Sequence, residues 1–136
     1  LPEVEARATG DWKRITKSYS SVFADTDLAE WMRERDLGTA TLVGYMTNNC
    51  VLASAAAAEP LGLAVEVLSD ATGAIPLSNA TGSASAAQVH ETVITLLNSN
   101  WAAVATTADW ISAVQAGTTL SGSNLVESAM AGRSIG

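Results

Sequence analysis

The sequence contains few residues of several chemically important kinds. One cysteine and one histidine among 136 residues exclude an internal disulfide framework and a metal site built from several Cys or His ligands. We therefore expect no metal and no other cofactor. Seven basic residues against 14 acidic ones give a net charge of −7, which disfavours a nucleic-acid partner because such proteins present a basic face to phosphates.

Long apolar runs are also missing. No stretch reaches the roughly 18 uninterrupted apolar residues that a membrane span needs. The acidic start Leu1–Glu5 does not resemble a secretory signal. We expect no membrane partner. A single cysteine fits a reducing compartment, so we expect a cytoplasmic protein.

The residues that are plentiful are those that build a core. Apolar residues make up 48% of the chain and charged residues 15%, which favours one folded domain over disorder. We place this domain at residues 1–115. Residues 116–136 are rich in Gly, Ser and Thr, so we expect a C-terminal tail or an oligomerisation arm. The apolar side chains of this tail fit a contact between subunits of a homo-oligomer: Leu120, Leu125, Val126, Met130 and Ile135.

Short apolar runs alternate with helical patterns along the chain. This alternation predicts an α/β fold with a parallel sheet and helices on both faces. The spacing of Asp27 and Glu30 predicts a capping box at the start of the first long helix. We expect a loop at residues 69–76. The expected strands cover 12–17, 39–44, 64–68 and 102–105, and the expected helices cover 25–35, 50–59, 86–98 and 107–115.

Cys50 is the first candidate functional residue. It follows an expected strand and the polar turn 45–49, and it begins an expected helix. The free N–H groups and the dipole at a helix start stabilise a thiolate and can receive a developing oxyanion. A buried structural cysteine is the alternative, because a free cysteine often behaves as a small hydrophobic residue.

The residues around Cys50 carry a resemblance to a known family. Residues 44–51, Gly-Tyr-Met-Thr-Asn-Asn-Cys-Val, resemble the Gly-x-x-Thr-x-x-Cys-Val signature of the isochorismatase-like cysteine hydrolases. The segment from Lys17 to Phe23 and the segment 62–71, which ends in Asp-Ala, are similar to two further family segments in the same order. With His90 and the region 101–110, the resemblance covers about residues 10–115.

This resemblance implies a fold and a set of site residues. The fold would be a Rossmann-like three-layer α/β/α arrangement with a parallel sheet. Cys50 would be the nucleophile and Lys17 the lysine of a Cys–Lys–Asp triad, whereas a lone lysine is ordinarily a solvated surface charge. The bond between Tyr45 and Met46 would be a cis peptide. It would direct the Met46 N–H, together with the Cys50 N–H, into an oxyanion hole.

The sequence departs from the family pattern at the third triad member. The family aspartate lies in an apolar-Asp-x-Gln-like segment on a first strand, well before the lysine. Only 16 residues precede Lys17, and none of them forms such a segment. We expect that the N-terminal part of the domain, with its first strand, is missing from this sequence. A degenerate, inactive family member is the alternative.

The resemblance implies hydrolysis of a small amide or related C–N bond through a cysteine thioester, with a small-molecule amide as substrate. Two alternatives stay open. One is isochorismatase-type vinyl-ether hydrolysis, whose family members lack the cysteine, and the other is a non-catalytic oligomeric α/β protein. Asp70 is expected to hold its loop through backbone N–H groups, and His90 to point outward or to pack. Four residues are candidates for the substrate pocket: Tyr19, Phe23, Tyr45 and Asn49.

Overall fold

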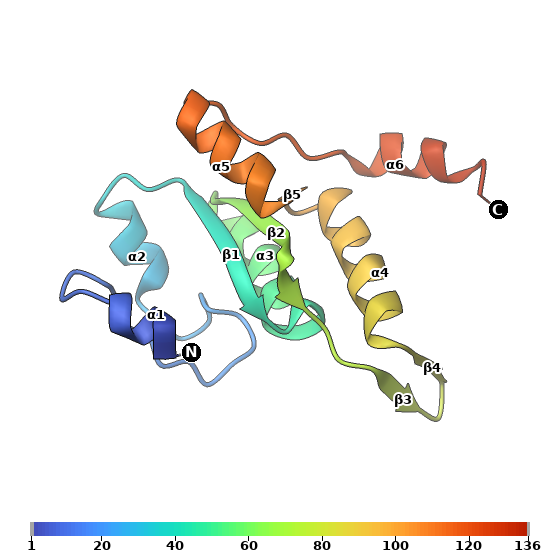
Figure 1. The fold of residues 1–136 in the computed structure, drawn as a ribbon, viewed down its shortest axis with the longest axis horizontal. Helices are drawn as coiled ribbons and strands as arrows, with labels where there is room; N and C mark the ends of the chain where they lie inside the picture. Colours follow the sequence, from blue (N-terminus) through green and yellow to red (C-terminus); the bar gives the residue numbers. More distant parts are fainter. Residues whose placement is uncertain (1, 136) are drawn as a thin grey trace.

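The computed structural model describes residues 2–135 and has a three-stranded parallel sheet at its centre (Figure 1). The strands β1 (Thr39–Tyr45) and β5 (Ala103–Ala105) flank β2 (Ala64–Gly73). In β1 and β2, Thr39 lies opposite Ala64, and β2 pairs with β5 from Glu66 opposite Ala103. The predicted α/β class and parallel sheet are confirmed.

Helices lie on both faces of this sheet. On one face, α3 (Leu52–Ala58) and α4 (Ala86–Asn98) pack against Val65 and Val67 of β2. On the other face lies α5 (Thr107–Ala116), whose Trp110 Nε1 donates a hydrogen bond to the Glu66 carboxylate at 2.9 Å. These positions form the expected three layers. The buried cluster comprises Phe23, Met32, Val51, Ala55, Ala58, Val65, Val67 and Leu97.

The starts of α4 and α5 are fixed by side-chain caps. At α4, Ser85 and Gln88 form a reciprocal capping box, and at α5 the Thr106 side chain accepts from the Asp109 N–H. The capping box predicted for Asp27 is wrong. Asp27 makes no side-chain cap for α2 (Leu28–Arg33), because its carboxylate pairs with the Lys13 ammonium at 2.7 Å.

Two expected elements differ in the structure. Residues 12–17 form an irregular segment instead of a strand, with Lys13 and Arg14 paired to Asp27 and Glu5. The expected loop 69–76 is partly strand, because β2 continues to Gly73. Its register against β1 shifts on the way: Leu42 pairs with Val67, but Gly44 pairs with Thr72.

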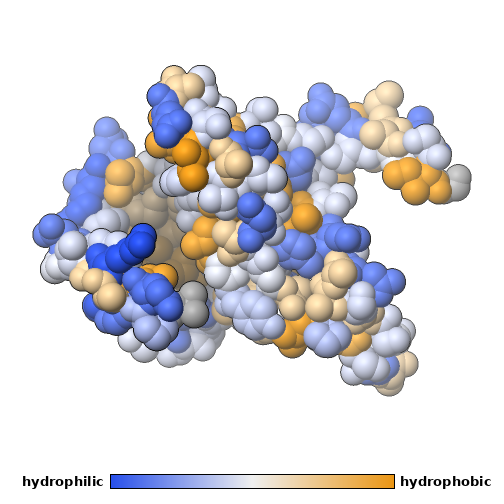
Figure 2. All heavy atoms as spheres, in the orientation of Figure 1, coloured by the Kyte–Doolittle hydropathy of each residue, from blue (hydrophilic) through white to orange (hydrophobic). Residues whose placement is uncertain are grey.

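The C-terminal tail contains a helix that the sequence patterns did not indicate. α6 (Leu125–Gly132) has no buried residue and stands away from the body of the molecule (Figure 1). The chain leaves the body at Ser123, whose N–H donates to the Asn98 carbonyl at 3.0 Å. Apolar side chains are visible on this arm in Figure 2, and its exposed members are Leu125, Val126, Met130 and Ile135.

The shorter elements lie around this framework. A hairpin of β3 (Leu77–Asn79) and β4 (Gly82–Ala84) leads into α4. The chain opens with α1 (Pro2–Arg7), and a 3-10 turn, η2 (Glu59–Leu61), joins α3 to β2. No helix among residues 2–135 is long and apolar enough to cross a membrane.

Candidate active site

Cys50 lies just beyond the C-terminal end of β1, in a π-helical turn, η1 (Thr47–Val51). The helix was expected to begin at residue 50. In the structure the π-helical turn begins already at Thr47, and the α-helix α3 begins at Leu52. The Met46 carbonyl accepts from the N–H of Asn49 at 3.1 Å and of Val51 at 3.2 Å. The wide turn places a half-buried thiol at the start of a helix, where the backbone favours negative charge.

Lys17 is the cation next to this thiol. Its Nζ lies 3.2 Å from the Cys50 Sγ and also donates to the Tyr19 carbonyl at 2.9 Å. The lysine comes from the irregular segment before α2, 33 residues earlier in the chain. The structure thus brings together the two residues that the resemblance pairs. An ammonium at this distance stabilises a thiolate electrostatically.

Ser54 connects α3 to the irregular segment that carries Lys17, residues 17–27, which we call the lysine loop. Its Oγ accepts a hydrogen bond from the Val22 N–H at 2.9 Å, and the serine side chain is buried. Ser54 follows Cys50 by four residues, so both face the same side of the helical segment. The loop has a further internal bond, from the Thr26 hydroxyl to the Val22 carbonyl at 2.6 Å. Sequence reasoning missed Ser54; its signal was a polar residue four positions after Cys50 in an alanine-rich helix.

A cis peptide joins Tyr45 and Met46, at the position that the resemblance implies. Gly44 precedes it with φ of 101°, a left-handed value that favours glycine. The backbone therefore departs from regular strand geometry at Gly44, within the last two residues of β1. The assignment of the Met46 and Cys50 N–H groups to an oxyanion hole stays a prediction.

His90 differs from the expectation of an outward or packing residue. On α4 it is half-buried, with Nδ1 2.9 Å from the Thr47 hydroxyl and Nε2 3.0 Å from the Ser69 carbonyl. Thr47 itself is completely buried in the turn that carries Cys50. Sequence reasoning missed Thr47 as a partner because the two residues are 43 positions apart.

Asp70 holds the start of α5 rather than its own loop. Its Oδ1 accepts from both the backbone N–H and the hydroxyl of Thr107, each at 2.8 Å. The Thr107 hydroxyl and then the Thr107 N–H stabilise the charged form, so they hold the pKa of the Asp70 carboxyl below its ordinary value. The hydrogen bonds of the Asp70 Oδ1 are therefore structural, because both join it to Thr107 at the start of α5.

The predicted pocket residues do not share one environment. Phe23 belongs to the buried hydrophobic cluster, and its place in a substrate pocket stays a prediction. Tyr19 and Tyr45 have exposed side chains. Asn49 is also exposed, on a shallow groove of about 330 Å³ whose lining includes Leu52, Leu96 and Trp101.

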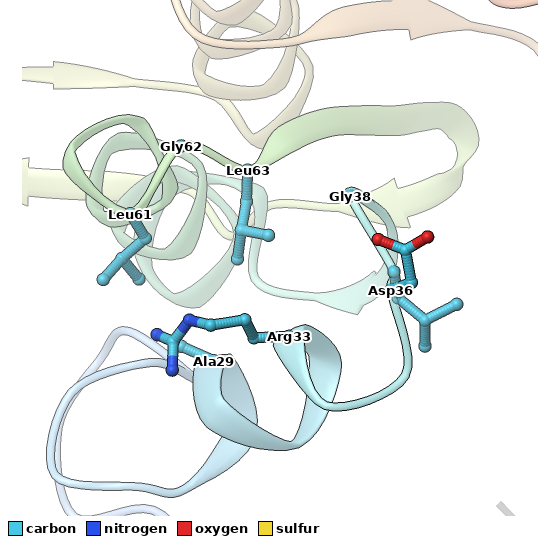
Figure 3. Close-up of a pocket in the computed structure, with 8 residues that line it drawn as sticks. Ala29, Arg33, Asp36, Gly38, Leu61, Gly62 and Leu63 are labelled. Atoms are coloured by element: carbon cyan, nitrogen blue, oxygen red, sulfur yellow. The ribbon is translucent and has the colours of Figure 1, made fainter.

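A second cavity, of about 210 Å³, lies at the other end of the sheet (Figure 3). Gly38 and Leu63, which precede β1 and β2, line it, whereas Cys50 follows the opposite end of β1. In the close-up, Arg33 extends across the space between α2 and the Leu61–Leu63 segment. This cavity is therefore separate from the thiol.

The composition of the site bears on the groups it can hold. Within residues 2–135, no three His, Cys, Asp or Glu side chains are grouped as a metal site would require. In the same part of the chain, the carboxylates that form ion pairs bind Lys13, Arg14 and Arg35, and none binds Lys17. The side chains that the structure brings together here are therefore a thiol and an ammonium.

These features define an α/β protein with a candidate nucleophilic cysteine at the C-terminal end of a parallel strand. The family model described as Isochorismatase domain matches residues 1–109. The chain therefore belongs to the isochorismatase family, and the family resemblance seen in the sequence is confirmed.

Solved structures agree with this assignment. A protein of Burkholderia xenovorans LB400 named as an isochorismatase is 44% identical, with a TM-score of 0.93 over 98% of this chain and 63% of its own. A cysteine hydrolase from Pseudomonas syringae pv. phaseolicola 1448A is 31% identical, with a TM-score of 0.71 over 74% of this chain and 47% of its own. An isochorismatase from Pseudomonas putida KT2440 is 27% identical, with a TM-score of 0.65 over 68% and 48%. The chain thus spans less than two thirds of the length of these proteins.

Proposed function

We propose that this protein contributes to a cysteine hydrolase that cleaves a small amide or a related C–N bond. The observation that carries the proposal is the 3.2 Å contact between the Lys17 Nζ and the Cys50 Sγ. Cys50 is the only cysteine of the chain, and it lies on a helix-starting turn beside a cation. Family membership and the cysteine hydrolase among the similar structures support the reaction class.

The proposed reaction begins at the thiolate of Cys50. The sulfur attacks the carbonyl carbon of the amide, and the carbonyl oxygen becomes an oxyanion. The N–H groups of Met46 and Cys50 are proposed to donate to this oxyanion. The C–N bond then breaks, the amine leaves with a proton, and a thioester forms between the substrate acyl group and Cys50.

Water completes the cycle. It attacks the thioester carbonyl, the C–S bond breaks, and the acid product leaves while Cys50 returns as the thiolate. Each step moves a proton, and a general acid and base speeds such transfers. The family resemblance assigns this task to an aspartate, for which the residues before Lys17 offer no matching segment. Lys17 is proposed to stabilise the thiolate and to position it.

A panel of small primary and secondary amides tests this proposal. Release of ammonia or amine is measured for the purified protein, for Cys50→Ala and for Cys50→Ser. We expect release that both substitutions abolish. The single thiol also allows the rate of alkylation by iodoacetamide to be followed without ambiguity.

Two outcomes contradict the proposal. Activity that survives Cys50→Ala excludes the thioester route. The second outcome combines two results: no amide of the panel is hydrolysed, and Cys50 reacts no faster with iodoacetamide than a free thiol at pH 7. Together they contradict the assignment of Cys50 as an activated nucleophile. Neither measurement needs an inhibitor, because the reaction of the Cys50 thiol with iodoacetamide reports its reactivity directly.

A further inference from the structure

The half-buried imidazole of His90 links three elements around the candidate nucleophile. It is on α4, its Nδ1 lies 2.9 Å from the Thr47 hydroxyl in η1, and its Nε2 lies 3.0 Å from the Ser69 carbonyl in β2. The reaction proposed above does not use this group. Its Nδ1 contact nevertheless ends on the turn that carries Cys50.

The Ser69 carbonyl fixes the direction of one hydrogen bond, and for a neutral imidazole it thereby fixes the direction of the other. The Ser69 carbonyl can only accept, so the Nε2 of His90 carries a proton and donates. In the neutral imidazole the Nδ1 is then an acceptor, so the Thr47 hydroxyl donates to it. The hydroxyl of a completely buried threonine is therefore held in one orientation by a ring that β2 holds in turn.

Thr47 occupies a critical place in the turn. It directly follows Met46, whose N–H is one proposed oxyanion donor, and it precedes Cys50 by three residues. The Thr47 carbonyl accepts from the Leu52 N–H, so the same residue also closes the wide turn into α3. A displacement of Thr47 would thus move the thiol and the two N–H groups together.

We propose that Thr47 and His90 are positioning residues. They hold the Cys50 thiol at a fixed position relative to the N–H groups of Met46 and Cys50. This inference rests on the proposed function of Cys50. It goes beyond that function because it assigns a role to the one histidine of the chain. Reaction rates depend steeply on such placement, since small misplacements of reacting groups lower them by one to two orders of magnitude.

Paired substitutions separate the two hydrogen bonds. Thr47→Val removes the hydroxyl at nearly constant shape, whereas Thr47→Ser keeps it. His90→Gln can keep a donor near the Nε2 position but loses the acceptor for Thr47, whereas His90→Asn can keep an acceptor near the Nδ1 position. Ser99→Ala is the matched control: it removes a buried hydroxyl that donates to the Leu96 carbonyl at the far end of α4.

Three measurements are made on each variant: thermal unfolding, kcat and KM on an amide that the protein hydrolyses, and the rate of Cys50 alkylation at one pH. We expect Thr47→Val and His90→Gln to lower kcat at least about tenfold with little change in KM. Both should also change the alkylation rate. Thr47→Ser and His90→Asn should retain most of the wild-type values, and Ser99→Ala should lower only the unfolding temperature.

A merely structural role gives a different pattern. If Thr47→Val and His90→Gln lower the unfolding temperature as Ser99→Ala does, yet leave kcat and the alkylation rate unchanged, the proposal is overturned. The alkylation rate does not depend on amide hydrolysis. If no amide is hydrolysed, the proposed function fails, but a changed alkylation rate in these two variants still supports the positioning role and an unchanged one refutes it.

Discussion

The Ser54 hydroxyl oxygen accepts a hydrogen bond from the Val22 N–H at 2.9 Å, one helical turn beyond Cys50. The lysine loop is therefore attached to the nucleophile's helical segment at two points, since Lys17 contacts Cys50 itself. The first attachment is neutral and half-buried, and the second is charged and exposed. The neutral one fixes the loop, and the charged one acts on the sulfur.

Loss of the neutral attachment should weaken both folding and thiol chemistry. Ser54→Ala leaves the Val22 N–H without its acceptor, so we expect the free energy of unfolding to fall by about 1–3 kcal/mol. We also expect slower alkylation of Cys50, because Lys17 would no longer be held beside it. Urea unfolding and iodoacetamide kinetics measure the two effects.

Ser112→Ala is the control for this prediction. Ser112 is an exposed serine on α5 whose hydroxyl donates within its own helix, to the Ala108 carbonyl. In Ser112→Ala, the free energy of unfolding and the alkylation rate of Cys50 should both stay near the wild-type values. Equal stability of Ser54→Ala and Ser112→Ala would contradict the role given to Ser54.

The charged attachment is tested by two lysines of the same segment. Lys17→Met removes the ammonium beside Cys50, and we expect Cys50 alkylation at pH 7 to slow about tenfold or more, because the thiolate loses its nearest cation. Lys13→Met removes a lysine that pairs with Asp27 instead, so the alkylation rate should not change. Equal rates for the two variants would show that the lysine next to the sulfur has no influence on it.

Asp70 should make stability depend on acid pH. The Thr107 hydroxyl and N–H lower the pKa of its carboxyl in the folded state. The resulting stabilisation is fully present above the ordinary Asp pKa of about 3.9, and it is lost as the pH falls through the lowered folded value. Asp70→Asn should therefore flatten the plot of unfolding free energy against pH below about pH 4.

The companion variant for Asp70 is Thr107→Val. It removes the hydroxyl bond, which is the largest cause of the lowered pKa, but keeps the backbone N–H. Its plot should lie between those of the wild type and Asp70→Asn. Coincident plots for all three proteins would contradict the prediction, and chemical unfolding at a series of pH values provides the measurement.

The projecting arm should mediate self-association. An isolated helix of eight residues is marginal in water, and α6 exposes Leu125, Val126 and Met130. The aligned structure from Burkholderia xenovorans covers 98% of the chain, so it shares most of this arm. We expect a second copy to cover the helix. Leu125→Ser with Met130→Ser should then shift the protein to the monomer in sedimentation velocity runs, whereas Glu127→Gln should not.

Local sequence patterns predicted those helices and strands well whose limits depend on residues close to one another in the sequence. The helix at 86–98 was predicted with its observed bounds, because its apolar spacing and limits are encoded within one segment. The strand at 39–44 was also predicted to within one residue. The irregular segment 12–17 was predicted wrongly, because its charged side chains pair with distant Asp27 and Glu5.

The candidate site was predicted in part. The motif around Cys50 and the lysine segment indicated which two residues meet, and the structure places them 3.2 Å apart. The Ser54–Val22 and Thr47–His90 bonds could not be predicted, because they join residues 32 and 43 positions apart that have no shared sequence pattern. The sequence could not show that Phe23 belongs to the core cluster, because an aromatic residue near a motif can line a pocket or pack in a core equally well.

The register shift between β1 and β2 has a consequence for how the molecule tolerates changes of length. Between the Leu42–Val67 and Gly44–Thr72 pairs, β1 advances two residues while β2 advances five. The surplus residues include Ser69, whose carbonyl binds His90 of α4, and Asp70, whose carboxylate binds Thr107 of α5. Deletion of one residue from 68–71 would loosen two helices on opposite faces of the sheet at once, so this short stretch should be the least tolerant of shortening in the whole of β2.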